Sequence, residues 1–349
     1  MRAVRLHGAE DARLDEIDEP TTGAGRVKIR VERTGICGSD LGLFRYAPIP
    51  DAYGHPLFHE TGPHVLGHEF SGRVVEIGDG VTGIELGTLV AVRPNVWDGT
   101  CPACLRGEPN LCESFGFVGI NGGGGGYSPF VVVAPDQVHA MPDSVGADAA
   151  AMVESTTVAW HAVKLSGAGE GSTALIIGAG PIGLALLLCL RARGASRVVV
   201  SEISESRRAL AERLGADTVD PRETDPVAHV RGSGGGVDVS FDASGVGEVT
   251  LLPALEALRP GGSSVIVAQF HGPVPIDPNL FLLGEKRVIG SFAYTDEDFA
   301  EVVALISSGE LDPRPLISTV LPLEDAIDGG LRHLLGEGRN TEVKMLIAP

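Results

Sequence analysis

The stretch STALIIGAGPIGLALLLCL, residues 172–190, decides the fold class of this chain. Its first six residues form a mostly apolar run typical of a buried strand, and its last seven predict an apolar helix. The turn between them, GAGPIG at 178–183, has the spacing Gly-x-Gly-x-x-Gly. In this setting the glycines permit a tight turn and the close approach of a pyrophosphate, and the helix N-terminus attracts the anion. The stretch therefore predicts a dinucleotide-binding α/β domain, with these candidate residues in the turn: Gly178, Gly180, Pro181, Ile182 and Gly183.

A carboxylate stands where the second strand of such a domain ends. The run RVVVS at 197–201 predicts that strand, and Glu202 follows it. A carboxylate at this place accepts hydrogen bonds from the adenosine ribose and repels a 2′-phosphate, so we expect NAD in preference to NADP. Arg207 and Arg208 are the counter-evidence, because nearby cations can hold such a phosphate; otherwise they belong to a helix surface.

The alternation of strands and helices continues beyond this point, which is typical of a parallel sheet buried on both faces. Further strands are expected at 236–242, 264–268, 287–294 and 343–347. Further helices are expected from Pro253 to Leu258, from Asp296 to Ser308 and from Leu323 to Leu335.

Two short motifs near the start of the chain carry ligand types that zinc accepts. GICGSD at 35–40 contains Cys37, and GHE at 67–69 contains His68 and Glu69. The flanking glycines allow φ values that other residues avoid, so a side chain can be aimed at one point. A catalytic zinc needs three protein ligands and an open position. The alternative is a buried cysteine and an unrelated histidine.

Three of the five cysteines, Cys101, Cys104 and Cys112, lie close together in the sequence. The chain begins MRAVRLH and continues into acidic sequence, without the apolar segment of a secretory signal. Clustered cysteines in a chain without an export signal favour metal binding over disulfides. We therefore expect a second metal site and a cytoplasmic location.

The composition argues against several kinds of partner. A net charge of −19 opposes binding to nucleic acid or to anionic membranes. An aromatic content of 5% argues against a surface that stacks bases. The longest uncharged apolar segment, 174–190, is too short and too interrupted by glycine and proline for a membrane span. A length of 349 residues suits two domains.

Together these motifs resemble those of the zinc-dependent medium-chain alcohol dehydrogenases, and the resemblance covers essentially the whole chain. It is strongest to the (R,R)-butanediol and polyol (sorbitol-type) branch, in the segments 64–72, 116–119, 152–161 and 200–202.

The resemblance implies an α/β chain with two domains. A GroES-like, β-rich catalytic domain is expected from residues 1–154 with 291–349. A Rossmann coenzyme domain with a doubly wound parallel sheet is expected at 155–290. The active cleft is expected between the two.

The resemblance also implies how the catalytic zinc is held. The segment around Glu154 supplies the third ligand in the family, so Glu154 joins Cys37 and His68. Glu69 competes for the same position, and the carboxylate that does not ligate lies nearby or is bridged by water. The alternative for Glu154 is a surface helix carboxylate.

The family's structural zinc lobe has a fourth cysteine, and this chain has Asp98 in its place. A carboxylate oxygen is an acceptable zinc ligand, so a site of Asp98, Cys101, Cys104 and Cys112 is implied. Because softer thiolates suit zinc better, we expect weaker binding than with four cysteines. The alternatives are an empty lobe or a cluster of reduced thiols.

Ser39 and Glu69 are the candidate catalytic side chains. Ser39 is expected to pass a proton away from the alcohol; its alternative role, compatible with the first, is a helix N-cap. Family members commonly carry a histidine five residues after the ligand cysteine, but here that position is Gly42. Solvent, or a histidine of the loop-like segment 43–66, must then complete the proton relay.

Four further contacts to the cofactor are expected from the resemblance. Arg207 lies beside the adenosine, and Phe292 and Tyr294 lie near the nicotinamide carboxamide. Val267 is a further expected contact.

The implied activity is hydride transfer between NAD and a small secondary alcohol or vicinal diol, with 2,3-butanediol and acetoin as the expected substrate pair. Sorbitol or xylitol, sugar and threonine dehydrogenases are the alternatives within the class. A silent NAD-binding redox sensor is the alternative outside it. The expected partners are a small alcohol or ketone and further copies of the chain, in a homodimer or homotetramer.

Overall fold

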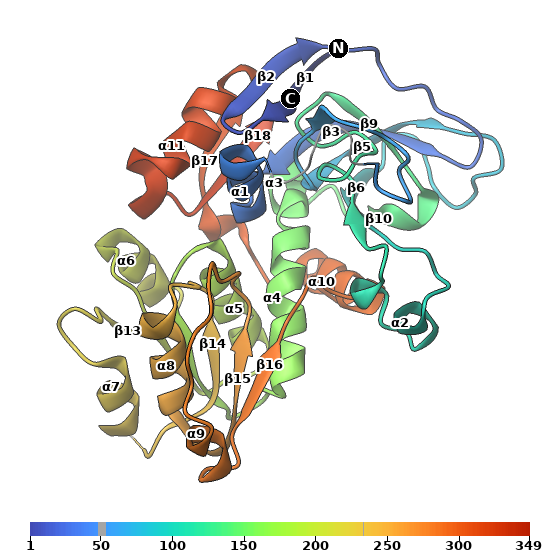
Figure 1. The fold of residues 1–349 in the computed structure, drawn as a ribbon. Coiled ribbons are helices and arrows are strands. Elements are labelled where there is room, and N and C mark those ends of the chain that lie inside the picture. The colour runs from blue at the N-terminus through green and yellow to red at the C-terminus, as the bar shows by residue number, and fades with distance from the viewer. Residues whose placement is uncertain (48–53, 233) are drawn as a thin grey trace. The chain divides into compact units, whose positions relative to one another are not determined.

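The computed structural model describes residues 1–47, 54–232 and 234–349. The chain forms two compact units, Met1–Glu154 with Thr295–Pro349 and Ser155–Tyr294 (Figure 1). Residues 48–53, within the loop predicted at 43–66, lie outside this description.

The unit Ser155–Tyr294 is built on a six-stranded parallel sheet with the order β13-β12-β11-β14-β15-β16. This is the strand order 3-2-1-4-5-6 of a doubly wound dinucleotide-binding fold, which confirms the predicted fold class. Its central strand, β11, is flanked by β12 and β14 and buries Leu175 and Ile176 completely. The strands are β11 (Thr173–Ile177), β12 (Arg197–Ser201), β13 (Asp217–Val219), β14 (Val237–Asp242), β15 (Leu258–Ile266) and β16 (Arg287–Gly290).

The helices of this unit follow the strands in alternation. They are α4 (Val153–Ser166), which begins just before the unit, then α5 (Pro181–Ala192), α6 (Glu205–Arg213), α7 (Pro226–Gly232), α8 (Glu248–Glu256) and α9 (Asn279–Leu282). The helix predicted from Pro253 to Leu258 has the wrong bounds: α8 begins at Glu248, and Leu258 already belongs to β15. Leu258 is fully buried and pairs with Val237 of β14, so sheet packing determines its conformation.

The other unit is built on a seven-stranded mixed sheet with the order β10-β6-β5-β3-β18-β17, in which β9 also pairs with β3. Strand β3 pairs antiparallel with β5 in a register that sets Gly35 opposite Glu69. Strand β18 pairs with the same end of β3, at Leu346 and Gly35. The strands are β3 (Val27–Gly35), β5 (Glu69–Ile77), β6 (Leu89–Val92), β9 (Phe130–Val133), β10 (Val138–Ala140), β17 (Ile317–Pro322) and β18 (Lys344–Ala348).

Smaller elements complete this unit. Two small sheets contain β1 (Arg2–Gly8), β2 (Asp11–Glu16), β4 (His64–Val65), β7 (Asn95–Val96) and β8 (Gly116–Phe117). The α-helices are α1 (Gly38–Tyr46), α2 (Pro102–Leu105), α3 (Gly146–Ala151), α10 (Asp296–Ser308) and α11 (His333–Leu335). Short 3₁₀ turns lie at η1 (Pro109–Leu111), η2 (Pro135–Gln137), η3 (Arg314–Leu316), η4 (Leu323–Asp325) and η6 (Glu337–Asn340). Among the described residues of the whole chain, no helix combines the length and the apolar character needed to cross a membrane.

The helix predicted from Leu323 to Leu335 is not one regular helix. It is divided into the 3₁₀ turn η4, the π-helical segment η5 (Ala326–Arg332) and α11. Gly330 lies inside η5, where a Cβ would approach the Ile36 side chain to 2.7 Å. Gly330 therefore packs closely against the residue that follows β3, a tertiary contact that the apolar pattern alone did not indicate.

Candidate active site and cofactor site

The pairing of β3 with β5 brings Cys37, His68 and Glu69 together. Cys37 lies two residues beyond the end of β3, and Glu69 begins β5 opposite Gly35. One potential ligand atom from each of the three residues lies within 4.8 Å of the other two. His68 and Glu69 are buried, and Cys37 is partly exposed. A thiolate, an imidazole and a carboxylate at this separation fit the donor set of a zinc ion with an open side.

Two glycines allow this close approach. A Cβ on Gly35 would lie 2.1 Å from Glu69 Oε2, so only glycine leaves room for the carboxylate. Gly67 has φ +94°, and a Cβ there would lie 2.5 Å from the Tyr127 ring. The glycines of both motifs therefore fix the backbone beside each ligand.

Asp40 positions both Cys37 and His68. It lies in the first turn of α1, where its Oδ2 accepts hydrogen bonds from the Cys37 N–H at 2.9 Å and from the Tyr127 hydroxyl at 3.1 Å. Its Oδ1 lies 3.5 Å from His68 Nδ1. Burial opposes protonation of His68, but the charges and hydrogen bonds of Asp40 and Cys37 together outweigh it and raise the pKa of the ring well above its usual value. Sequence reasoning missed Asp40, although a carboxylate three residues after a helix N-cap is a recognisable capping signal.

Ser39 lies beside the same imidazole. Its Oγ is 3.4 Å from His68 Nε2, and the residue is exposed. The alternative role as a helix N-cap is wrong, because Cys37 is the N-cap of α1 and Ser39 lies within the helix. The Ser39 hydroxyl therefore has access both to the ligand cluster and to solvent.

The Glu69 carboxylate is shared with a buried lysine. Lys344 at the start of β18 forms an ion pair with Glu69 Oε2, and each side chain is 1% exposed. Lys344 also donates a hydrogen bond to the Ile36 carbonyl at 3.2 Å. Burial opposes protonation of Lys344, but the charges of Glu69, Cys37 and Glu154 outweigh it and raise the pKa of its ammonium group. One Glu69 oxygen is therefore neutralised by the protein itself.

Glu154, the other expected carboxylate ligand, is the second residue of α4 and is 4% exposed. Within the described residues, the 4.8 Å cluster contains Cys37, His68 and Glu69 but does not include Glu154. The charge of Glu154 nevertheless reaches Lys344, which binds Glu69. Glu154 is therefore buried in the neighbourhood of the cluster, and it is not a surface carboxylate.

Asp98, Cys101, Cys104 and Cys112 form a second cluster, in which one ligand atom from each lies within 4.8 Å of the others. Asp98 Oδ1 accepts hydrogen bonds from the N–H groups of Thr100 at 2.6 Å and Cys101 at 2.8 Å. These bonds lower the pKa of the Asp98 carboxyl to about 2. An ionised carboxylate among three thiol groups fits a tetrahedral zinc site.

Asp98→Asn separates ligation from a purely structural role. The amide can still accept the two backbone hydrogen bonds, but it has no anionic oxygen for a metal. If Asp98 is a ligand, we expect zinc affinity of the lobe to fall by about 10-fold or more. Chelator competition with zinc counted per chain measures the change, and Asp98→Cys is the control expected to bind more tightly. Unchanged zinc affinity in Asp98→Asn would show that Asp98 only stabilises the turn.

The Gly-rich turn has the geometry that a dinucleotide requires. It joins β11 to α5, and Gly180 is the N-cap of the helix. A Cβ on Gly183 would lie 1.9 Å from the Gly178 carbonyl oxygen, whereas a Cβ on Gly180 would meet no atom within 4 Å. Gly183 is therefore needed for packing of the turn, and the space at Gly180 is open to a ligand.

Gly183→Ala and Gly180→Ala are expected to fail in different ways. Gly183→Ala should destabilise the protein by about 1–3 kcal/mol, because the backbone must move to admit the methyl group. Gly180→Ala should leave stability nearly unchanged and weaken dinucleotide binding by about 10-fold or more, because the methyl occupies the approach of the pyrophosphate. Thermal unfolding and cofactor titration measure the two effects. Dinucleotide binding at wild-type affinity in Gly180→Ala would contradict the assignment of this turn.

Glu202 follows β12 and lies against the same turn. Its Oε2 accepts a hydrogen bond from Ala179 N–H at 2.7 Å, and its Oε1 accepts one from Ser204 N–H at 2.8 Å. Arg207 and Arg208 lie in α6, and Arg208 forms an ion pair with Asp220. The position of Glu202 beside the turn is the one from which a carboxylate meets the adenosine ribose.

The remaining predicted cofactor contacts belong to the same unit. Val267 directly follows β15, and its N–H donates to the Asp242 carbonyl at 3.0 Å. It therefore lies at the carboxyl edge of the sheet, where ligands of this fold bind. Phe292 is 54% exposed, and Tyr294 is buried.

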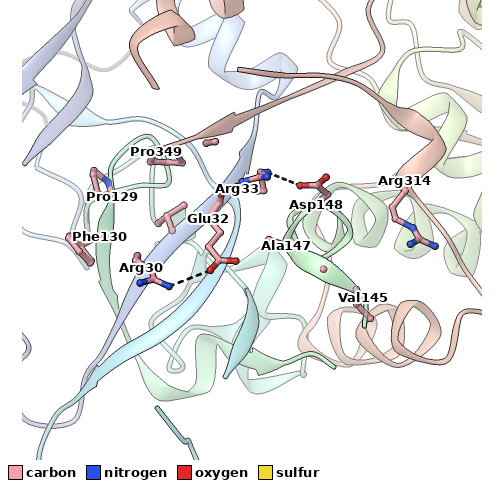
Figure 2. Close-up of a pocket in the computed structure, with 13 residues that line it drawn as sticks. Arg30, Glu32, Arg33, Pro129, Phe130, Val145, Ala147, Asp148, Arg314 and Pro349 are labelled. Carbon is pink, nitrogen blue, oxygen red and sulfur yellow. Dashed lines mark hydrogen bonds and ion pairs between the residues drawn. The ribbon is translucent and has the colours of Figure 1, made fainter. Parts of the chain in front are cut away.

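A separate hollow of about 690 Å³ lies in the unit that contains the zinc-type clusters (Figure 2). It includes Arg30, Arg33 and Arg314, but each guanidinium is paired with a carboxylate. Figure 2 shows two of these pairs, Arg30 with Glu32 and Arg33 with Asp148. None of the predicted site residues lines this hollow, and its arginine charges are neutralised, so we assign it no role in the chemistry.

The fold and the two clusters define a metal-binding dehydrogenase with a dinucleotide unit, and comparison with known proteins gives its family. A family model described as zinc-binding dehydrogenase matches residues 181–308. One described as alcohol dehydrogenase GroES-like domain matches residues 23–143. The (R,R)-butanediol dehydrogenase of Bacillus subtilis (strain 168) is 39% identical over 353 residues, with all of both chains covered.

Solved structures with the same fold indicate the same family. The crystal structure of the 2R,3R-butanediol dehydrogenase from Bacillus subtilis covers 100% of this chain and 99% of its own, with a TM-score of 0.93 and 39% identity. A protein of Sinorhizobium meliloti 1021, solved with NADP bound, has a TM-score of 0.91 and 33% identity, and the match covers 100% and 99% of the two chains. This chain belongs to the zinc-binding, medium-chain alcohol dehydrogenase family. It is an oxidoreductase whose family implies Zn²⁺, a nicotinamide cofactor and a small alcohol substrate.

Proposed function

We propose that this protein transfers hydride between NAD and a small secondary alcohol or vicinal diol, with 2,3-butanediol and acetoin as its substrate pair. The observation that carries the proposal is the Cys37–His68–Glu69 cluster in a chain with a complete dinucleotide turn. The choice of substrate rests on the Bacillus subtilis relative, which is 39% identical over the whole chain.

In this proposal Cys37 and His68 hold the zinc, and Glu154 or Glu69 supplies the third donor. Bound zinc lowers the pKa of an alcohol and polarises a carbonyl, and bound nicotinamide exchanges hydride with the substrate carbon. Asp40 keeps the Cys37 backbone and the His68 ring in place through the contacts described above. A carboxylate behind a ligating histidine fixes the orientation of the ring and raises its basicity.

The proton of the alcohol leaves through Ser39. Its Oγ lies within reach of the His68 ring, and the residue is exposed, so the hydroxyl can accept this proton and pass one to water. Because Gly42 carries no imidazole, solvent or a histidine of the segment 43–66 replaces the histidine that completes the relay in other family members. Lys344 holds one Glu69 oxygen, which favours Glu154 as the carboxylate that completes the set.

NAD is proposed over NADP because Glu202 presents a carboxylate beside the Gly-rich turn. We also propose that the cofactor contacts four further residues of the chain: Arg207, Val267, Phe292 and Tyr294. As a domain assignment we propose residues 1–154 with 291–349 for the zinc domain, and 155–290 for the coenzyme domain.

Assembly and location are also proposals. The expected homodimer or homotetramer would pair edge strands around residues 288–294, although β16 itself ends at Gly290, short of the strand predicted to reach Tyr294. Two observations support this: β16 is the last strand of its sheet, and Val288 and Phe292 are exposed. The proposal of a cytoplasmic location rests on the clustered free cysteines, which suit a reducing compartment. The proposed absence of nucleic-acid and membrane partners rests on the acidic composition.

A substrate panel at measured zinc content tests the function. It should include the stereoisomers of 2,3-butanediol, acetoin, sorbitol, xylitol, a simple sugar and L-threonine, each with NAD and with NADP. We expect the highest kcat/KM with a butanediol isomer and NAD. A higher kcat/KM with a polyol, a sugar or threonine would reassign the substrate, and no turnover of any alcohol by zinc-loaded protein would favour the redox-sensor alternative.

A further inference from the structure

Two carboxylates lie side by side where β12 and β13 end. These strands pair in parallel, with Ser201 opposite Val219, and the next residues are Glu202 and Asp220. The Glu202 N–H donates to the Val219 carbonyl at 3.1 Å, so the pairing continues to this edge. Asp220 therefore occupies the same edge of the sheet as the carboxylate proposed to meet the adenosine ribose.

Asp220 is 7% exposed and binds two arginines. Its Oδ1 accepts a hydrogen bond from Arg222 Nε at 2.8 Å, and its Oδ2 lies 3.0 Å from Arg208 Nη1. The fork of Arg222 bonds both carboxylate oxygens, an arrangement in which the guanidinium is firmly held. Binding to Arg222 and Arg208 keeps the pKa of the Asp220 carboxyl far below its usual range, so its charge is permanent at neutral pH.

The two guanidinium groups also hold the backbone beside the proposed ribose site. Arg208 Nη1 donates to the Glu202 carbonyl at 2.8 Å, and Arg222 Nη2 donates to the Ile203 carbonyl at 2.8 Å. The hydrogen bond and charge of Asp220 raise the pKa of Arg222, and the charge of Glu202 adds to this effect. Two cations therefore lie beside the backbone that carries Glu202, and Asp220 binds both of them.

Asp220 balances the charge of the group formed by the two carboxylates and the two arginines. Glu202 and Asp220 contribute two negative charges, and Arg208 and Arg222 two positive ones, so the four groups sum to zero. Without Asp220 the remaining three would carry a net positive charge, and both guanidinium forks would be available to a phosphate. A phosphate monoester carries between one and two negative charges at neutral pH, so it is sensitive to this difference.

We propose that Asp220 is a specificity-determining residue for the nicotinamide cofactor: by engaging Arg208 and Arg222 it withholds them from a 2′-phosphate and so favours NAD. This inference rests on the proposed preference for NAD. It attributes that preference to two carboxylates, Glu202 and Asp220, and not to Glu202 alone. Glu202 repels the 2′-phosphate directly, and Asp220 removes the cations that would attract it. Asp220 touches neither ribose nor phosphate and acts through the arginines.

Binding of NAD⁺ and NADP⁺ to four proteins tests the proposal by calorimetry: wild type, Glu202→Gln, Asp220→Asn and the double variant. In Asp220→Asn we expect NADP⁺ to bind about 10-fold more tightly, and NAD⁺ to change by less than about 3-fold. The double variant should gain about 100-fold for NADP⁺, and the gains should shrink as salt is raised.

The matched control is Asp217→Asn. Asp217 begins β13, the strand that Asp220 follows, and it pairs with Arg197 and His229, but it lies at the other end of the strand from Glu202. This variant should leave the NADP⁺ to NAD⁺ affinity ratio unchanged. A purely structural role for Asp220 predicts instead that Asp220→Asn weakens both cofactors by the same factor, and that result would overturn the proposal.

A second variant covers the case in which Asp220→Asn does not fold. The side chain of Arg222 is 64% exposed, so Glu202→Gln/Arg222→Gln should fold. Because Asp220 is intact and already withholds Arg222, this variant should bind NADP⁺ and NAD⁺ within about 3-fold of Glu202→Gln alone; a larger loss of NADP⁺ affinity would show that Arg222 reaches the phosphate despite Asp220, and it would overturn the proposal. The affinities of the wild-type protein test the proposed NAD preference, and tighter binding of NADP⁺ than of NAD⁺ would contradict it. The change in the affinity ratio between wild type and Asp220→Asn tests the role of Asp220 independently.

Discussion

Cys37→Ala is expected to reduce kcat by about 10³-fold or more, because a metal that stabilises the transition state contributes several kcal/mol and each 1.36 kcal/mol is a factor of ten. The thiolate is one of three donors in the cluster, and no other cysteine belongs to that cluster. His68→Ala should have the same effect. Dinucleotide affinity should remain at the wild-type value in both variants, because the Gly-rich turn lies in the other unit.

The matched control for the loss of a thiol is Cys189→Ala. Cys189 is fully buried in α5 and belongs to neither metal-type cluster. Its replacement should cost stability but leave zinc content and kcat near the wild-type values. Zinc should fall by one ion per chain in Cys37→Ala and by none in Cys189→Ala. Wild-type turnover in Cys37→Ala would contradict the proposed role of the cluster.

Lys344→Met is expected to lower the free energy of unfolding by about 3–5 kcal/mol, the usual cost of leaving one partner of a buried ion pair alone. Lys344 and Glu69 are each 1% exposed, so water cannot replace the lost ammonium group. The hydrogen bond from Lys344 to the Ile36 carbonyl is lost as well. Denaturant unfolding of metal-free protein measures the change without a contribution from zinc.

Two further variants show whether the unpaired charge is the cause. Glu69→Gln/Lys344→Met removes both charges and should recover most of the loss. Lys28→Met is the matched control: the Lys28 side chain is 5% exposed, but its partners Glu19 and Glu76 are about half exposed. Because water can solvate those carboxylates, Lys28→Met should cost only about 1 kcal/mol. Equal losses from Lys28→Met and Lys344→Met would contradict the explanation.

The sequence predicted the coenzyme unit well because its signals are local. The apolar run before Gly178 became β11, the following helix became α5, and Glu202 follows β12 as expected. Parallel strands buried on both faces have nearly continuous apolar sequences, which a short window reveals. The helix predicted from Pro253 to Leu258 had the wrong bounds, because Leu258 belongs to β15 and takes its conformation from pairing with β14.

The candidate site was predicted only in part. Cys37, His68 and Glu69 lie in short motifs and are brought together by the β3–β5 pairing. Lys344 was missed because it is distant in sequence and reaches the site only through the pairing of β18 with β3. Asp220 was missed for a similar reason: its importance comes from Arg208 and Arg222, which meet it only in the folded unit.

Zinc titration of the demetallated enzyme tests the central claim most directly. Protein stripped of metal by a chelator, with zinc counted per chain, should lose turnover of 2,3-butanediol while it still binds the nicotinamide cofactor. Added zinc should restore turnover in wild type but not in Cys37→Ala. Undiminished turnover by fully demetallated wild-type protein would contradict the account.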